Sequence, residues 1–330
     1  MDAQAFRHWL DRVPELTPRQ RLSLLRSLAP APATGPLGQG SAASSEFPDL
    51  PDLPDCPHCH AEAGNLRPWG FTRGLARYRC QCCQRTCTAL TGSSLARLQH
   101  PDQWNAYAQA LIDGLSVRAA AQLCGLSKNT SFLWRHRFLA LIAEHRDAHE
   151  AGIVEAGETF FRESFKGQRH IPRPAHQRGA LGKAPDTDAA PIPVLVVRDR
   201  SGHTADFKLD RLDAAQLAER LKPLVDADVL LCTDDAAAYA GFARAAQLTH
   251  VAVPAQTGGR SQGGAYHIQN VSAYHGRLKN WMGRFHGVAT HYLDHYLGWR
   301  RMLERYGDAI TPQHCLSEAL GRGMQHGLGT

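Results

Sequence analysis

The sequence lacks long hydrophobic runs. No apolar stretch in its 330 residues approaches the roughly 20 residues that a helix needs to cross a bilayer. Its first residues, MDAQAFRHWLDR, contain no apolar core of the kind found in a secretory signal. No repeat of fixed period occurs either, which excludes a solenoid. We therefore expect a globular protein of the cytoplasm that is not integral to a membrane.

A strong excess of one charge is also missing. The chain has 37 basic and 31 acidic residues, a formal net charge of +6, and 18 histidines. Such a mildly basic surface permits binding to nucleic acid without requiring it. At 43% hydrophobic and 21% charged residues, the composition is that of an ordinary folded chain, and the length predicts two or three domains.

Cysteine is scarce except in one segment. Six of the nine cysteines lie between residues 56 and 87, which fits a metal site in a reducing cytoplasm better than a secreted disulfide framework. Two Cys-x-x-Cys pairs, CPHC and CQCC, have the spacing at which two tight turns offer four thiolates to one tetrahedral Zn²⁺. The predicted ligands are Cys56, Cys59, Cys80 and Cys83.

The other residues of this segment receive minor roles. We expect Cys82 to point away from the metal and Cys87 to serve as a small apolar residue. His58 or His60 as a ligand is an alternative, and so are free buried or redox-active cysteines. The double Cys-x-x-Cys spacing favours the zinc site, whose metal would supply much of the folding energy of so small a unit.

The chain before the cysteines divides in two. Residues 3–29 have the pattern of two short amphipathic helices, the second begun by Thr17 as cap and Pro18 in the first turn. Residues 30–54 are rich in Pro, Gly, Ala and Ser, with few large apolar side chains. Because such a segment buries too little surface to offset its ordering entropy, we interpret it as a flexible linker.

A helical region follows the cysteines. Its periodicity predicts three helices, with Ser116 and Ser127 as caps and Gly125 ending the helix between them. This is the spacing of a helix-turn-helix. The residues expected to pack it are Ala120, Leu123, Leu126 and Leu133.

The second capped helix would then offer polar side chains to double-stranded DNA. The predicted contacts are Lys128, Asn129, Thr130 and Arg135, on an exposed face able to reach base edges or phosphates. An ordinary helical hairpin with a solvated basic face is the alternative. The neighbouring zinc ribbon favours the DNA-binding helix-turn-helix over the ordinary hairpin.

From Ile153 the pattern changes to a mixed α/β domain in which three strands lead and helices then alternate with strands. The expected strands are 153–161, 192–200, 203–209, 228–234 and 249–254. The expected helices are 213–224, 236–246, 270–285 and 290–306.

Acidic residues mark two of these strands. Glu155 and Glu158 flank Gly157, and a glycine inside a strand weakens it, which suggests a site. Asp234 and Asp235 end another strand at the carboxyl edge of the sheet, where functional side chains are exposed. Capping of the next helix is an alternative role for Asp235.

A basic segment over residues 267–301 follows, dense in His, Arg and aromatic residues and suited to a phosphate backbone. Its predicted DNA contacts are Arg277, Arg284, Arg300 and Arg301, with Lys279 beside them.

The order of these parts resembles one family. The stretches YRCQCCQRTCTALTGSSLARL, VEAGETFFRESFKGQR, LCTDDAAAYAGF and HIQNV…YHGRLKNW…FHGVATHYL are similar to those of the zinc-ribbon insertion-sequence transposases of the IS fifteen-ninety-five group, which are bacterial. The resemblance implies an RNase H-like catalytic domain. The domains expected are a helical element at 1–29, a linker at 30–54, a zinc ribbon at 55–98, a helix-turn-helix at 101–147, the transposase domain at 150–310 and a tail at 311–330.

The resemblance also implies a reaction and its residues. In the family, carboxylates hold two Mg²⁺ ions that drive cleavage and strand transfer at the terminal inverted repeats of the element, with the protein expected as a homo-oligomer on DNA. The first catalytic aspartate would stand at Gly157, the second at Asp234, and the third position, Asn or Glu, at Ser272. Lys279 matches the family lysine.

Two of these positions depart from the pattern. Gly157 has no ligand atom, and the neutral hydroxyl of Ser272 is a poor substitute for Asn or Glu, so Mg²⁺ is expected to bind weakly. Glu155 or Asp235 are candidate substitutes. The sequence therefore predicts a transposase with impaired catalysis, and a non-catalytic DNA-binding regulator or inhibitory remnant is the alternative.

Overall fold

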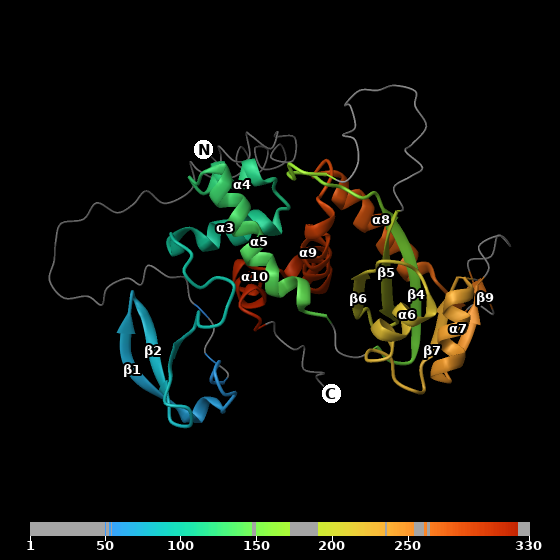
Figure 1. Ribbon diagram of the computed structural model, residues 1–330, viewed down its shortest axis with the longest axis horizontal. Helices are drawn as coiled ribbons and strands as arrows, with labels where there is room; N and C mark the ends of the chain where they lie inside the picture. The colour runs from blue at the N-terminus through green and yellow to red at the C-terminus, as the bar shows by residue number, and fades with distance from the viewer. Residues whose placement is uncertain are drawn as a thin grey trace, which may run out of the picture. The chain divides into compact units, whose positions relative to one another are not determined.

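Figure 1 shows the computed structural model of the chain. It describes residues 50–322 except 51–52, 54, 147–149, 172–190, 235, 254–260 and 263–264. The helices expected at 3–29, most of the linker and Asp235 thus lie outside the described residues. Within them, none of the helices is long and apolar enough to span a membrane.

A small three-stranded antiparallel sheet comes first, in the order β1-β2-β3. Its strands are β1 (Leu66–Thr72), β2 (Leu75–Cys80) and β3 (Thr86–Thr88), after a 3₁₀ turn at Ala63–Asn65. Arg73 and Gly74 form the two-residue connection between β1 and β2, and both have positive φ, of 49° and 79°. This is the backbone of a tight hairpin turn that matches the twist of its strands.

Three helices follow. They are α3 (Trp104–Ile112), preceded by a 3₁₀ turn at Pro101–Gln103, α4 (Val117–Leu123) and α5 (Lys128–Glu144). The caps expected from the sequence are confirmed: the Ser116 hydroxyl accepts from the Ala119 N–H at 3.2 Å, and that of Ser127 accepts from the Thr130 N–H at 3.1 Å. Gly125, at φ 64°, turns the chain between α4 and α5. The packing role expected of Leu133 is wrong, because its side chain is 53% exposed on α5.

The last part of the chain is built on a five-stranded mixed sheet, as expected. Its strands are β4 (Ile153–Phe161), β5 (Ile192–Asp199), β6 (Thr204–Lys208), β7 (Leu230–Thr233) and β8 (Thr249–Ala252), in the order β6-β5-β4-β7-β8. The first three pair antiparallel, whereas β4, β7 and β8 run parallel. Two short strands, β9 (Ser261–Gln262) and β10 (Tyr266–His267), form a separate ladder.

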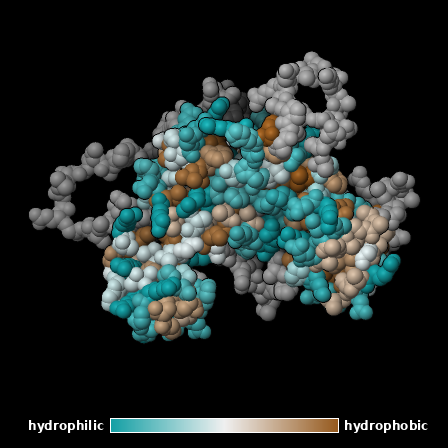
Figure 2. All heavy atoms as spheres, in the orientation of Figure 1, coloured by the Kyte–Doolittle hydropathy of each residue, from teal (hydrophilic) through white to brown (hydrophobic). Residues whose placement is uncertain are grey.

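Helices accompany this sheet. They are α6 (Ala214–Leu221), α7 (Ala237–Ala246), α8 (Gln269–Gly283) and α9 (Leu293–Tyr306), the last entered through a 3₁₀ turn at Thr290–Tyr292. Leu217 of α6 and Phe242 of α7 pack with Val154 and Leu195 in one of the two hydrophobic cores. In Figure 2 a mildly hydrophobic area lies over α7, which is rich in alanine, and hydrophilic side chains cover most of the remaining visible face.

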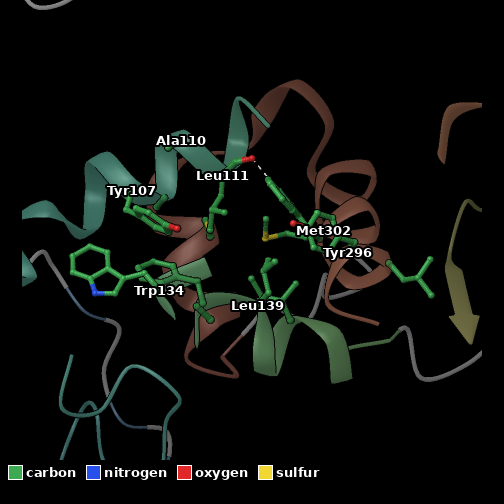
Figure 3. Packing of buried hydrophobic residues seen from close by; sticks show 14 of the residues in the cluster. Tyr107, Ala110, Leu111, Trp134, Leu139, Tyr296 and Met302 are labelled. Atoms are coloured by element: carbon green, nitrogen blue, oxygen red, sulfur yellow. Dashed lines mark hydrogen bonds between the residues drawn. The ribbon is translucent and has the colours of Figure 1, made fainter. Parts of the chain in front are cut away.

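The second core joins the helical region to the part of the chain built on the five-stranded sheet. Figure 3 shows Tyr107 and Leu111 of α3 with Trp134 and Leu139 of α5 facing Met302 of α9. The indole N–H of Trp299 donates to the carbonyl of Leu111 at 2.9 Å. Helices α5 and α9 cross at Gly298, where a Cβ atom would meet the Ala143 backbone at 2.5 Å. The two helices therefore share one closely packed interface.

The expected C-terminal tail is partly wrong. Helix α10 (Pro312–Ala319) follows a 3₁₀ turn at Gly307–Ala309. The Thr311 hydroxyl caps it by accepting from the His314 N–H at 3.2 Å. Its buried Glu318 accepts from Tyr306 and Arg305, both at 2.9 Å. The Thr-Pro start signal was present in the sequence, and the burial of this short helix supplies the rest of its stability.

Candidate functional site

Four cysteine sulfurs lie together at the base of the small sheet. Cys56 and Cys83 are 3.7 Å apart, as are Cys59 and Cys80, and all four sulfur atoms lie within 4.8 Å of one another. A tetrahedral zinc ion with Zn–S bonds of about 2.3 Å requires sulfurs about 3.8 Å apart. The arrangement could therefore hold one metal ion, and its donor set suits zinc.

The neighbouring residues stand outside this cluster. Cys82 is exposed and Cys87 is buried, as expected, and neither belongs to the group of ligand atoms. His58 and His60 are not part of it either. A hydrogen bond from the Cys83 backbone N–H is the largest of the causes that lower the pKa of the Cys80 thiol to about 6. Despite a hydrogen bond from the Ala61 backbone, burial and the three neighbouring thiols raise the pKa of Cys59 to about 12, so without metal the proton stays on Cys59 when Cys80 has lost its own.

A second candidate site lies at one edge of the large sheet. Strands β4 and β7 pair in parallel, and their last paired residues are Glu155 and Cys232, two residues before Gly157 and Asp234 respectively. Helix α8 crosses this edge, because a Cβ atom at residue 157 would lie 3.3 Å from a methyl group of Val271. Ser272 follows Val271 in α8 and is exposed, whereas the α8 residues nearest to position 157 are Val271 and His275.

Asp234 is the carboxylate that the chain retains at these positions. Its Oδ1 accepts from the Ala236 N–H at 3.2 Å, which orients it at the entrance to α7. Glu158 lies on the opposite face of β4, where its Oε2 accepts from the Tyr239 hydroxyl at 2.8 Å. Burial, opposed by that hydrogen bond and aided by the Asp234 charge, raises the pKa of Glu158.

Glu155 does not serve as the substitute ligand considered from the sequence. Its side chain is fully buried, and it accepts from Arg200 at 2.5 Å and from the Asn270 side chain at 2.9 Å. Its other oxygen accepts from the backbone N–H groups of Asn270 and Val271 at 2.8 and 3.1 Å. The carboxylate thus satisfies free N–H groups in the first turn of α8 and anchors that helix to β4. Its lone pairs are committed to these donors.

His275 is a residue of this edge that sequence reasoning missed. Its Cε1 would lie 3.7 Å from a Cβ atom at residue 157, and its buried Nε2 has no hydrogen-bond partner among the described residues. Burial, aided by the nearby Lys279 charge, lowers the pKa of His275 to about 4. A neutral ring therefore packs against the glycine, one turn after Ser272. That one-turn spacing was the available sequence signal.

The predicted DNA contacts of α5 divide into two groups. Lys128 and Asn129 are exposed, and Thr130 is half-buried. The exposure expected of Arg135 is wrong: it is 1% exposed, donates to the Leu115 carbonyl at 2.6 Å and stacks over the Trp299 ring at 5.0 Å. Arg135 ties α5 into the core.

The basic segment divides similarly. Arg301 is buried, pairs with Asp206 and donates to the carbonyl of Ala143 at 3.0 Å, so its expected role in DNA contact is wrong. Arg277 and Arg300 both pair with Glu304, which leaves less free positive charge than the sequence suggests. The other two basic side chains, Lys279 and Arg284, are exposed.

One family model matches part of the chain. Residues 150–300 match the ISXO2-like transposase domain, and curated proteins gave no match. Among solved structures, the chain is similar to a pre-cleavage Mos1 transpososome, at 14% identity and a TM-score of 0.21, over 67% of this chain and 79% of that one.

Two further Mos1 structures are similar. The strand transfer complex aligns at 14% identity and a TM-score of 0.23, over 65% of this chain and 77% of that one. The paired-end complex with the left transposon end aligns at 15% identity and a TM-score of 0.22, over 66% of this chain and 79% of that one. The family match is independent of these structures: residues 150–300 are similar to the ISXO2-like transposase domain.

Proposed function

We propose that the chain is an insertion-sequence transposase that binds terminal inverted-repeat DNA and whose DNA cleavage and strand transfer are impaired. The observation that carries this proposal is the edge where β4, β7 and α8 meet. Of the three positions that the family resemblance assigns to metal ligands, Gly157, Asp234 and Ser272, Asp234 alone is a carboxylate.

The residues present do not fit a pair of catalytic Mg²⁺ ions. Magnesium prefers oxygen ligands, and in two-metal phosphoryl transfer a carboxylate shared by the ions holds them at the reacting phosphate. Gly157 supplies no oxygen, and Ser272 supplies a neutral hydroxyl. Glu155 is occupied by four donor groups, and Glu158 faces Tyr239 on the other side of the strand.

The test is a cleavage and strand-transfer assay on terminal-repeat DNA with Mg²⁺ or Mn²⁺. The parent chain is expected to show little or no product, and the Gly157→Asp, Ser272→Asn double variant to recover turnover. The new Cβ atom would lie 3.3 Å from a Val271 methyl group and 3.7 Å from the His275 ring, so these two side chains must move to admit the carboxylate. Adding Asp234→Asn to the double variant should abolish the recovered activity. Robust cleavage by the parent would overturn the proposal of impairment.

A non-catalytic DNA-binding regulator, or an inhibitory remnant, is the second candidate. The commitment of Glu155 to α8 favours it, because that carboxylate has a structural role that is independent of metal. A restored double variant that binds DNA but still fails to cut it would support this second function. Terminal inverted repeats flanking the gene would favour the transposase.

DNA binding in this proposal rests on α4 and α5 as a helix-turn-helix, with Lys128, Asn129 and Thr130 as contacts, and on Lys279 and Arg284 of α8. Affinity for duplex DNA should fall as salt rises, because phosphate contacts release counterions. We infer zinc as the metal of the cysteine cluster, and a homo-oligomer on paired transposon ends. A Lys128→Gln, Asn129→Ala variant that binds terminal-repeat DNA as well as the parent would remove α5 from the contact.

A further inference from the structure

The hairpin of β1 and β2 is a projecting ribbon that the assignments above leave unused (Figure 1). In the order β1-β2-β3, β1 forms the edge of its sheet, and every residue of β1 after Leu66 is exposed. The tight turn at Arg73 and Gly74 keeps the two strands together. A two-stranded ribbon of this kind is narrow enough to enter the major groove of duplex DNA.

The charge of the protein is concentrated around this hairpin. Residues 63–101 contain no acidic residue and six arginines, which are Arg67, Arg73, Arg77, Arg79, Arg85 and Arg97. This +6 equals the formal net charge of the whole chain, so the remaining residues are formally neutral. A zinc ion with four thiolates would subtract about two charges and still leave the segment strongly basic.

One face of the hairpin gathers three of these arginines. Arg67 lies directly opposite Arg79 across the strand pair, and Arg77, two residues before Arg79, projects to the same side. Like charges in directly opposed positions destabilise a strand pair. In the described part of the chain none of the three has an acidic partner within ion-pair distance. An anion bound across this face would remove the repulsion.

Aromatic side chains are exposed on the same hairpin. The Trp69 ring lies 4.8 Å from the Arg79 guanidinium and is 52% exposed, and Phe71 is 80% exposed. Exposed large apolar groups next to cationic ones are typical of surfaces that meet a macromolecule. A hollow of about 430 Å³ beside the turn, lined by Arg73 and Arg97, continues the basic surface. The absence of acidic residues favours a polyanion over a protein partner of mixed charge.

We propose that this hairpin binds duplex DNA, with Arg67, Arg77 and Arg79 contacting phosphates and Trp69 packing beside the backbone. The inference rests on the proposed function and adds to it a DNA-binding surface separate from α5 and α8. Phosphate contacts carry no sequence information by themselves. The hairpin therefore strengthens binding to any duplex, whereas α5 is the element expected to recognise the terminal repeat.

The experiment measures binding of the full chain to a fluorescein-labelled duplex of mixed sequence by anisotropy over a range of salt concentrations. The Arg67→Gln, Arg79→Gln variant is compared with the parent and with a Lys222→Gln, Arg244→Gln control, which removes the same charge from exposed positions near and on α6 and α7. Zinc content is measured in each protein to verify that the ribbon is intact. A labelled oligo-dT serves as a second probe.

The hairpin variant is expected to bind about tenfold more weakly near 0.1 M salt, with a log–log salt slope smaller by about two, and the control to behave like the parent. Trp69→Ala should weaken duplex binding further. If the parent binds the duplex and the hairpin variant binds it equally well, the hairpin inference fails while the proposed function stands. If the parent binds no duplex, both fail. If the hairpin variant binds oligo-dT more weakly than the parent but binds the duplex equally well, the assignment to duplex DNA is overturned.

Discussion

The cysteine cluster of the small sheet and the edge of the large sheet near Gly157 are expected to respond differently to the loss of metal ligands: the first by unfolding, the second by losing only its metal. In the small sheet two of the four clustered cysteines, Cys56 and Cys80, are fully buried, so the proposed ligands are also part of the interior. At the sheet edge the scaffold is held by other means, including Glu155 on α8 and the packing of Val271 on β4. Ligands can therefore disappear from the edge without unfolding it, whereas the cysteines cannot change without consequence.

The largest expected effect comes from changing a cysteine of the cluster. Cys56→Ser removes one of four sulfurs, and the metal-binding energy that it weakens is folding energy, about 10–16 kcal/mol in zinc-finger peptides. The small sheet should unfold and lose zinc while the five-stranded sheet stays folded. Elemental analysis and limited proteolysis measure both.

Cys82→Ser is the matched control, because this neighbouring thiol is exposed and outside the cluster. It should retain one zinc ion per chain. Parent protein purified without chelator that contains no zinc would contradict the prediction.

Local patterns in the sequence predicted the cluster of four cysteines and the order of the elements. Two Cys-x-x-Cys pairs and the serine caps of α4 and α5 are determined by neighbours a few residues away, so spacing alone reveals them. Arg135 and Arg301 could not be placed in this way. An arginine in a helix has the same local pattern whether it faces DNA or a buried carboxylate, and the partner of Arg301, Asp206, comes from a strand far away in the chain.

The same limit applies to the candidate site. The resemblance predicted that Gly157, Asp234 and Ser272 would meet, and the pairing of β4 with β7 ends two residues before Gly157 and Asp234, so this stays a prediction. The commitment of Glu155 was not predictable, because its donors come from Arg200 and from the first turn of α8. A carboxylate in a strand looks the same in sequence whether it binds metal or anchors a helix.

The next largest effect comes from changing Glu155, which anchors α8 to β4. Glu155→Gln leaves the partly exposed guanidinium of Arg200 without its anion and weakens the cap of α8. Breaking a buried ion pair costs about 3–5 kcal/mol; because Arg200 keeps some contact with water, urea unfolding should show a loss near the lower end, about 3 kcal/mol. Glu219→Gln, an exposed position on α6, should change stability by less than about 0.5 kcal/mol. A Glu155→Gln protein as stable as the parent would contradict the anchoring role.

A smaller effect tests the interface that joins the two regions. Gly298→Ala places a methyl group 2.5 Å from the Ala143 Cα and 2.7 Å from the Ile142 carbonyl oxygen. Backbone atoms cannot move aside as a flexible side chain can, so the variant should lose about 2–3 kcal/mol. Gly276→Ala in α8 meets nothing within 4 Å and should gain up to about 1 kcal/mol from helix propensity. Equal melting temperatures for the two variants would refute the close crossing of α5 and α9.

The smallest effect at neutral pH concerns a histidine pair on α5 and α9. The Nδ1 atoms of His136 and His295 lie 2.9 Å apart, and the His136 ring stacks on Tyr292 with ring centres 3.6 Å apart. In such a pair one nitrogen donates and the other accepts, so protonating both rings places two donors face to face. Burial, aided by the His295 charge, lowers the pKa of His136 from its ordinary value of 6.5 to about 3.

The sign of the pH dependence follows from that shift. Between about pH 6.5 and pH 3 the unfolded chain binds a proton at His136 that the folded chain does not, so stability falls as the solution is acidified. His136→Phe keeps an aromatic ring against Tyr292 and removes the titrating group. Urea unfolding of parent and variant should give similar free energies at neutral pH and a growing advantage for the variant below about pH 6. Loss of zinc in acid affects both proteins alike, so the difference between their curves is the readout. Parallel curves down to about pH 4.5 would show that His136 is protonated equally in both states and that the pair does not couple the two helices to pH.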